Sequence, residues 1–224
     1  MESIYYTLVA SLPHLPHFTK AERLPITRQR LRERLQMLSP EDRELVQRAA
    51  DFLAWQRQPA TRRDAEMAKA YQKLEEKIGS PDLWSLFAFP LNVRTVLAAL
   101  RRRRRGLTPP PGEFWGVGPW VRHLEQHWDH PDFKLANVFP WLPHARQLLE
   151  AHAALELERF LMDLIWQHVE RVAPGFEFSL RTVLAYLFKW DLLQLWLAQD
   201  PLAAAQRFDS LVTGVLDDYG PIFA

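Results

Sequence analysis

The amino-acid sequence predicts an all-α fold of about eight helices in two connected helical bundles. Apolar residues recur every three or four positions over most of the chain, which is typical of amphipathic helices. Helix start signals also recur, in which Ser, Thr or Asp precedes a proline or an acidic first turn. The alternation of apolar and polar residues that is typical of a strand is suggested only within residues 5–12.

The first half of the predicted fold comprises residues 1–105, where four polar residues each precede an apolar periodic stretch. Side-chain oxygens at such positions accept hydrogen bonds from the free N–H groups of a helix's first turn. Pro90 has no backbone N–H to donate, so we expect the last of these helices to restart there. The predicted helices run over residues 28–38, from Ser39-Pro40, from Thr61 to Ile78, and from Ser80-Pro81 to the arginines at 101–105.

A linker is predicted at residues 106–118, since residues 106–112 combine three prolines with two glycines and cannot continue a helix. A second helical half follows over residues 119–224. Apolar residues recur at seven-residue spacing within its longest predicted helix, which is typical of a bundle helix. The expected helices of this half run over about residues 119–128, 140–172, 179–199 and 200–219.

The composition excludes several kinds of site. The chain of 224 residues contains no cysteine, so it forms no disulfide, no thiolate metal site and no cysteine nucleophile. Its 28 Lys and Arg residues nearly balance its 27 Asp and Glu residues, which gives a formal net charge of +1. That balance disfavours a surface built wholly to grip nucleic acid, and we do not expect nucleic acid as the partner.

The chain is expected to be cytoplasmic, and to reach a membrane surface only through a partner. Residues 1–12 lack the basic leader and the cleavage site of a secretory signal peptide. The uncharged stretch at residues 192–198 is far shorter than the roughly 20 residues that span a bilayer. We therefore expect no direct membrane insertion. The absence of cysteine also fits a reducing compartment.

Five consecutive arginines end the last predicted helix of the first half. They can dock onto an acidic protein surface, bind the phosphates of a nucleic acid, or simply interact with the helix dipole in solvent, which contributes roughly 0.3–1 kcal/mol for each cation. Nine tryptophans and 13 phenylalanines favour either packing between helices or a docking surface, because Trp and Arg dominate interface energetics. The arginines are Arg101, Arg102, Arg103, Arg104 and Arg105.

No enzymatic activity and no cofactor are expected, because the sequence has no phosphate-binding loop, no dinucleotide-binding turn and no serine elbow. The best metal candidates are His123, His127 and His130. The first two share a helix face at a spacing that suits two imidazoles on one Zn²⁺. The glutamate of the metalloprotease motif is misplaced, however, and spacing assigns no third ligand. Surface histidines without a metal are the favoured interpretation.

Two segments resemble known families. Residues 91–97, Leu-Asn-Val-Arg-Thr-Val-Leu, together with the arginines at 101–105 and Gly106-Leu107, resemble a stretch of the C-type (also called d-type) subunit of V/A-type ATPases. The opening residues 5–13 look like the start of an uncharacterised bacterial family encoded beside V/A-type ATPase subunits. The resemblance implies an all-α, non-catalytic protein, because the C-type subunit is a socket that seats the central rotor shaft on the membrane ring.

The resemblance implies a non-enzymatic structural subunit or assembly factor of a bacterial V/A-type ATPase. Its partners would be other protein subunits, among them those of the ATPase stalk. The chain is shorter than the three helical repeats of the C-type subunit need, so an assembly factor or reduced homologue fits as well as a full socket. The alternatives are a basic-patch nucleic-acid-binding or regulatory adaptor and a metal-dependent enzyme. The implied docking residues are Asn92, Arg94, Arg101, Arg102, Arg103, Arg104 and Arg105.

Overall fold

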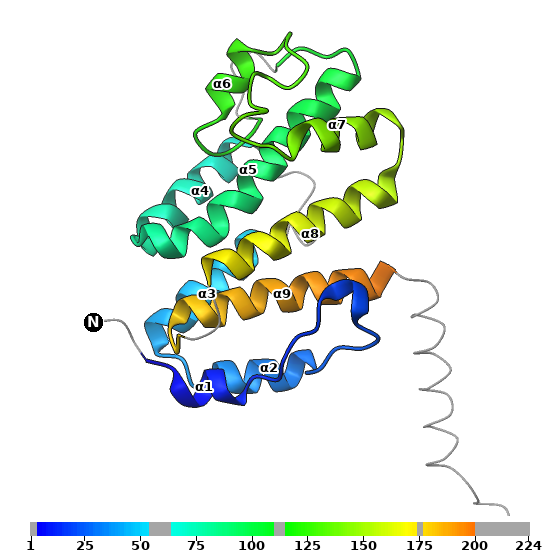
Figure 1. Cartoon of the computed structure of the whole chain (residues 1–224). Helices are drawn as coiled ribbons and strands as arrows, with labels where there is room; N and C mark the ends of the chain where they lie inside the picture. The colour runs from blue at the N-terminus through cyan, green and yellow to red at the C-terminus, as the bar shows by residue number, and fades with distance from the viewer. Residues whose placement is uncertain (1–3, 54–63, 110–114, 174–176, 200–224) are drawn as a thin grey trace, which may run out of the picture.

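The computed structural model describes residues 4–53, 64–109, 115–173 and 177–199 (Figure 1). These residues form nine α-helices and one short 3-10 helix without a strand, which confirms the predicted all-α class. The helix predicted at residues 200–219 lies outside the described ranges. The elements are α1 (Tyr6–Ser11), η1 (Phe18–Lys20), α2 (Arg28–Leu35), α3 (Pro40–Leu53), α4 (Asp64–Ile78), α5 (Pro81–Arg104), α6 (Val121–Gln126), α7 (Leu142–Glu150), α8 (Ala154–Val172) and α9 (Leu180–Gln199).

The helices are stacked, with α1 and α2 at one end and α6 and α7 at the other (Figure 1). Between these ends, α9 packs against α8, and α8 in turn packs against both α5 and α7. The 3-10 helix η1, from the first twenty residues of the chain, contacts α9. Elements that are far apart in the sequence therefore lie side by side.

Three hydrophobic cores hold the stack together, and each combines residues from before position 106 with residues from after position 118. The predicted linker at residues 106–118 therefore does not separate one core from another. The first core pairs Leu8, Leu45 and Leu86 with Val169 and Val183; the second pairs Val96 and Leu100 with Leu124 and Leu142; the third pairs Phe18 and Leu31 with Trp166 and Trp190.

Three of the four predicted helix starts are confirmed by side-chain caps. The hydroxyl oxygen of Thr27 accepts from the Arg30 N–H at 3.3 Å, so α2 begins at the expected residue, although it ends at Leu35 instead of residue 38. Ser39 accepts from the Asp42 N–H at 3.1 Å, and Ser80 accepts from Leu83 at 3.5 Å. Thr61 lies outside the described residues.

The prediction of one helix over residues 140–172 is wrong, because the chain breaks between α7 and α8. His152 adopts a left-handed conformation with φ of 58°. Its N–H donates to the Leu149 carbonyl at 3.3 Å, and the Ala153 N–H donates to the Leu148 carbonyl at 3.0 Å. This pair of bonds is a Schellman motif, which usually has glycine at the left-handed position. Residues 6–11, within the stretch that suggested alternation, form helix α1.

The prediction that the helix restarts at Pro90 is also wrong, since α5, which is 24 residues long, continues through it without a break. A proline inside a helix costs about 3 kcal/mol. Burying Leu86 and Phe87, both completely inaccessible to solvent, contributes about 1.5–3 kcal/mol each. The packing of α5 on its neighbours therefore offsets the loss at Pro90.

By length and composition, α5 is apolar enough to cross a membrane, and the expectation based on residues 192–198 overlooked it. Half of its most apolar stretch is buried inside the structure, against α4, α6, α7, α8 and α9. The central helix of a folded core passes the same test. Its apolar composition is thus accounted for by the contacts that surround it.

His168 of α8 lies against α5 next to Pro90. Its Nε2 donates to the Ser85 carbonyl at 3.0 Å, and its ring stacks on Phe89 with centroids 4.0 Å apart. Burial lowers the pKa of His168 below its usual value and nearby Arg171 also lowers it, while the hydrogen bond to Ser85 raises it. The neutral imidazole is the form that fits this contact.

The first prediction concerns acid stability. Because the pKa of His168 is lower in the folded than in the unfolded chain, the unfolded chain takes up the proton first as the pH falls below about 6.5. The stability that this group contributes is therefore present above that pH and lost below it. His168→Gln keeps an N–H donor but cannot titrate. Urea unfolding from about pH 7.5 to about pH 5.5 should show the wild type losing its advantage over this variant, by at most about 1.4 kcal/mol per pH unit. A constant difference would contradict the prediction.

The second prediction concerns the two predicted halves. Residues 1–105 and residues 106–224, expressed separately, should each fail to show a cooperative urea transition by circular dichroism, since each fragment exposes its side of all three cores. Mixing the two fragments should restore the transition. A cooperative transition in either fragment alone would show that one half carries a self-sufficient core.

Candidate functional site

Thr95 holds the loop at residues 115–120 against α5. Its side chain is buried, and its hydroxyl donates to the Val117 carbonyl at 2.9 Å and accepts from the Val117 N–H at 3.1 Å. Both polar groups of that residue's backbone are thereby satisfied by one side chain. The threonine of the Asn-Val-Arg-Thr stretch thus positions a loop more than twenty residues further along the chain.

Two glycines bring this loop into close contact with α5. A Cβ atom at Gly116 would lie 2.6 Å from the Thr95 methyl group. A Cβ atom at Gly118 would lie 2.6 Å from Asn92 Oδ1, and Gly118 also has φ of 91°, which other residues adopt only with strain. Asn92 and Thr95 therefore contact one glycine each.

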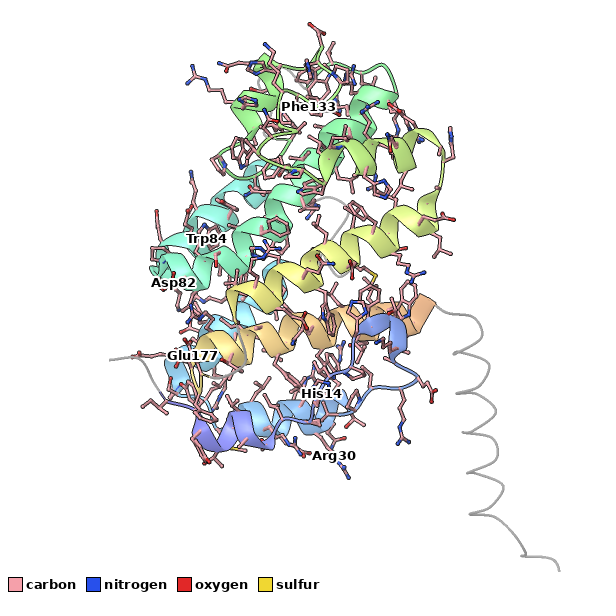
Figure 2. The ribbon with its side chains drawn as sticks, viewed as in Figure 1. His14, Arg30, Asp82, Trp84, Phe133 and Glu177 are labelled. Carbon is pink, nitrogen blue, oxygen red and sulfur yellow. The ribbon has the colours of Figure 1, made fainter. Side chains whose placement is uncertain are left out.

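A cleft of about 830 Å³ lies beside this loop, between α4, α5 and α6. Its volume falls in the range of about 300–1,000 Å³ that is typical of binding sites. Figure 2 shows Trp84 where α4 and α5 lie side by side, with Phe133 among the loops near α6. The lining residues are Tyr71, Gln72 and Glu75 of α4; Trp84, Ala88 and Asn92 of α5; and Gly116, Val117, Gly118, Pro119, Val121, Arg122 and Glu125.

Two polar side chains of the cleft, Tyr71 and Glu125, contact tryptophan rings. The rings of Tyr71 and Trp84 meet edge to face with centroids 5.0 Å apart. Burial and then the charge of Glu75 raise the pKa of Tyr71 to about 12, although a hydrogen bond with Trp84 opposes this. The phenol therefore stays protonated at neutral pH. Trp115 donates from its indole nitrogen to Glu125 Oε1 at 2.9 Å.

Asn92 carries an unusual buried atom. Its Oδ1 is inaccessible to solvent and has no hydrogen-bond partner within the described part of the chain. Leaving a buried acceptor without a donor costs about 1–3 kcal/mol. Gly118 approaches this oxygen closely, as described above. Of the residues implied by the sequence resemblance, Asn92 is the one that lines the cleft.

The arginines lie at the other end of α5, and three of them donate to backbone carbonyls of neighbouring loops. Arg102 donates to Thr108, and Arg104 to Leu149, at 2.6 and 2.5 Å. Arg103 donates to the carbonyls of Asp129 and Pro131, both at 3.3 Å. These bonds hold the loops around the end of the helix. The sequence did not predict this structural role of the arginines. The exposed arginines of the implied set are Arg94, Arg101, Arg104 and Arg105.

The implied docking residues therefore lie at two places along α5, and their role in docking remains a prediction. Asn92 and Arg104 are 12 positions apart on α5, which corresponds to roughly 18 Å at 1.5 Å per residue. Asn92 belongs to the cleft, whereas Arg101 and Arg105 belong to the helix end. The other lining residues of the cleft were not predicted. The sequence signal that could have indicated the cleft is the pair Gly116 and Gly118, two of only eight glycines in the chain, which allow a loop to approach a helix closely.

The three candidate metal ligands make other contacts. His123 Nε2 donates to the Phe133 carbonyl at 2.9 Å, and His127 Nδ1 donates to the His123 carbonyl at 3.0 Å. Their rings stack, with centroids 4.3 Å apart. His130 Nδ1 accepts from the N–H groups of Asp132 and Lys134. Within the described ranges, no group of three or more His, Asp or Glu side chains is placed to hold a metal ion.

The third prediction tests the loop clamp. Thr95→Val removes the hydroxyl while keeping the shape of the side chain, so the N–H and carbonyl of Val117 lose their partner. We expect a loss of about 2 kcal/mol in the free energy of unfolding, measured in urea. Thr95→Ser is the matched control: it keeps the hydroxyl and loses one methyl group, which costs about 1 kcal/mol. An equal or larger loss in the serine variant would mean that the methyl contact, not the hydroxyl, positions the loop.

Comparison with known proteins identifies one family. A family model described as "Protein of unknown function (DUF2764)" matches residues 45–218. No curated protein and no solved structure matches the chain. The family description names no ATPase, so the resemblance of residues 91–107 to an ATPase subunit remains a prediction. The match covers more than half of the sequence and includes the cleft and the arginine-rich end of α5, and the chain therefore belongs to the DUF2764 family.

Proposed function

We propose that this protein is a non-enzymatic structural subunit or assembly factor that docks onto a bacterial V/A-type ATPase. The observation that carries the proposal is the resemblance of residues 91–107 to a stretch of the C-type ATPase subunit, which in that family is a helix followed by a turn. Residues 91–104 lie in α5, and Arg105 and Gly106 form the turn that follows. The chemistry of that helix end supports docking by charge.

Two of the five consecutive arginines are suited to meet a partner. Arg101 and Arg105 are exposed, whereas Arg102, Arg103 and the likewise exposed Arg104 donate to loop carbonyls. An arginine at the surface keeps its charge at all physiological pH values and pairs in a fixed geometry with carboxylates. Exposed charges of this kind steer association and fix the orientation of a complex. An acidic surface on the ATPase stalk is the expected counterpart.

The helix end also has a structural role, which separates this proposal from the nucleic-acid alternative. Arginines that donate to the carbonyls of Thr108, Asp129 and Leu149 are held in place by the fold. Each of these bonds occupies one of the five N–H groups of a guanidinium and fixes its position, which limits how the side chain can follow a phosphate backbone. The charges left exposed are few, and the chain as a whole has a net charge of +1.

The fourth prediction compares two double variants. Arg101→Ala with Arg105→Ala should weaken binding to purified V/A-type ATPase stalk subunits about tenfold and flatten its salt dependence, because exposed cations are lost. The melting temperature should stay nearly unchanged. Arg103→Ala with Arg104→Ala removes donors from loop carbonyls and should lower the melting temperature. Binding would be measured by biolayer interferometry at several salt concentrations, and melting by circular dichroism.

Two results would contradict the proposal at different levels. If the wild-type chain binds no stalk subunit at low salt, the association with the ATPase fails as a whole. If binding occurs but the Arg101 and Arg105 variant binds as tightly as the wild type, the helix end is not the docking surface.

A further inference from the structure

The cleft between α4, α5 and α6 has a chemistry that the arginine-rich helix end does not explain. Glu75 comes from α4 and Glu125 from α6, and both carboxylates are exposed. Among the described residues that line the cleft, Arg122 is the one with a cationic side chain. Tyr71 adds no charge, because its phenol remains protonated. The described lining residues therefore carry a formal charge of −1, from Glu75, Glu125 and Arg122, which favours a cation.

The aromatic side chains of the cleft also favour a cation, and in particular a planar one. The half-buried ring of Trp84, which meets the buried ring of Tyr71 edge to face, places aromatic surface beside the carboxylates. A cation over an aromatic face gains about 0.5–1 kcal/mol at an exposed site and more when desolvated. A guanidinium group is planar, stacks on aromatic rings, and is less strongly hydrated than an ammonium group. Its several N–H groups can also reach two acceptors at once.

Asn92 supplies a further acceptor. Its Oδ1 is buried without a partner in the described part of the chain, and its residue lines the cleft. Gly118 covers the oxygen, so a ligand reaches it only when the Asn92 side chain rotates toward the cleft. An incoming N–H donor would then satisfy an atom that is unsatisfied in the free protein, which favours the bound state.

We propose that this cleft binds the guanidinium group of an arginine side chain presented by the partner protein. The inference rests on the proposed function, since it names the chemistry that a docking protein recognises at a second surface. Glu75 and Glu125 pair with the guanidinium charge, Trp84 stacks on its plane, and Asn92 accepts one of its N–H groups. The volume of about 830 Å³ leaves room for the backbone and the neighbouring residues of the partner segment.

The fifth prediction uses Nα-acetyl-arginine amide as the probe on the full chain. Titration should shift the Trp84 indole ¹⁵N–¹H signal, assigned with Trp84→Phe, with a dissociation constant in the millimolar range. Nα-acetyl-citrulline amide, in which a neutral urea group replaces the guanidinium, should bind at least about tenfold more weakly. Nα-acetyl-lysine amide should also bind more weakly, because an ammonium group does not stack in the same way.

Variants of the carboxylates provide the matched comparison. Glu75→Gln with Glu125→Gln should weaken binding of the arginine probe about tenfold, while Glu125→Gln still leaves an oxygen to accept from Trp115. Glu76→Gln changes an exposed carboxylate of α4 that does not line the cleft, and it should bind as the wild type does. Unchanged melting temperatures would show that the variants are folded.

The inference is overturned if the Trp84 signal does not respond to the arginine probe, if citrulline or lysine amide binds equally well, or if the double variant binds as tightly as Glu76→Gln. None of these measurements involves an ATPase subunit. Binding of the probe without binding of stalk subunits would thus reject the proposed function and keep the arginine site. Binding of stalk subunits without binding of the probe would reject the arginine site and keep the proposed function.

Discussion

The packing of α5 against five other helices is the constraint on which the rest of the structure depends. Nine of its side chains are buried, and α4, α6, α7, α8 and α9 all contact it. That packing carries the helix through Pro90 and places His168 against Ser85 and Phe89, next to that proline. The middle of α5 then positions the cleft, through Asn92 and Thr95, and its C-terminal end carries the arginines. Both candidate surfaces depend on a single helix.

The sequence predicted the all-α class and the helix starts well, because these depend on local chemistry. Thr27, Ser39 and Ser80 each need only a hydroxyl next to a free N–H. The sequence predicted helix ends and breaks poorly where tertiary contacts decide them. His152 takes a left-handed position that glycine usually fills, so the break between α7 and α8 had no local signal. At Pro90 the local signal was present, and the packing of α5 overrode it.

The candidate site was predicted only in part, for a similar reason. Asn92 and the arginines stand out within one segment of sequence, so a resemblance could point to them. Tyr71, Glu75 and Glu125 come from two other helices, and no spacing rule connects them. The arginine run was interpreted as a single charged patch. In the structure it divides into side chains that bind loop carbonyls and side chains that remain at the surface.

The first forty residues pack against the last described helix, and this has a consequence for how the chain folds during synthesis. Tyr5 donates its N–H to the Phe178 carbonyl at 2.5 Å, and Trp190 donates to the Ile26 carbonyl at 3.0 Å. Leu15, Phe18 and Leu31 find their buried surroundings among residues of α8 and α9. During synthesis these apolar side chains emerge from the ribosome long before their partners do, and long-range contacts of this kind form slowly. The nascent chain therefore passes through a stage in which these apolar side chains are exposed. At that stage aggregation competes with folding, and a chaperone that covers apolar surface would have its largest effect.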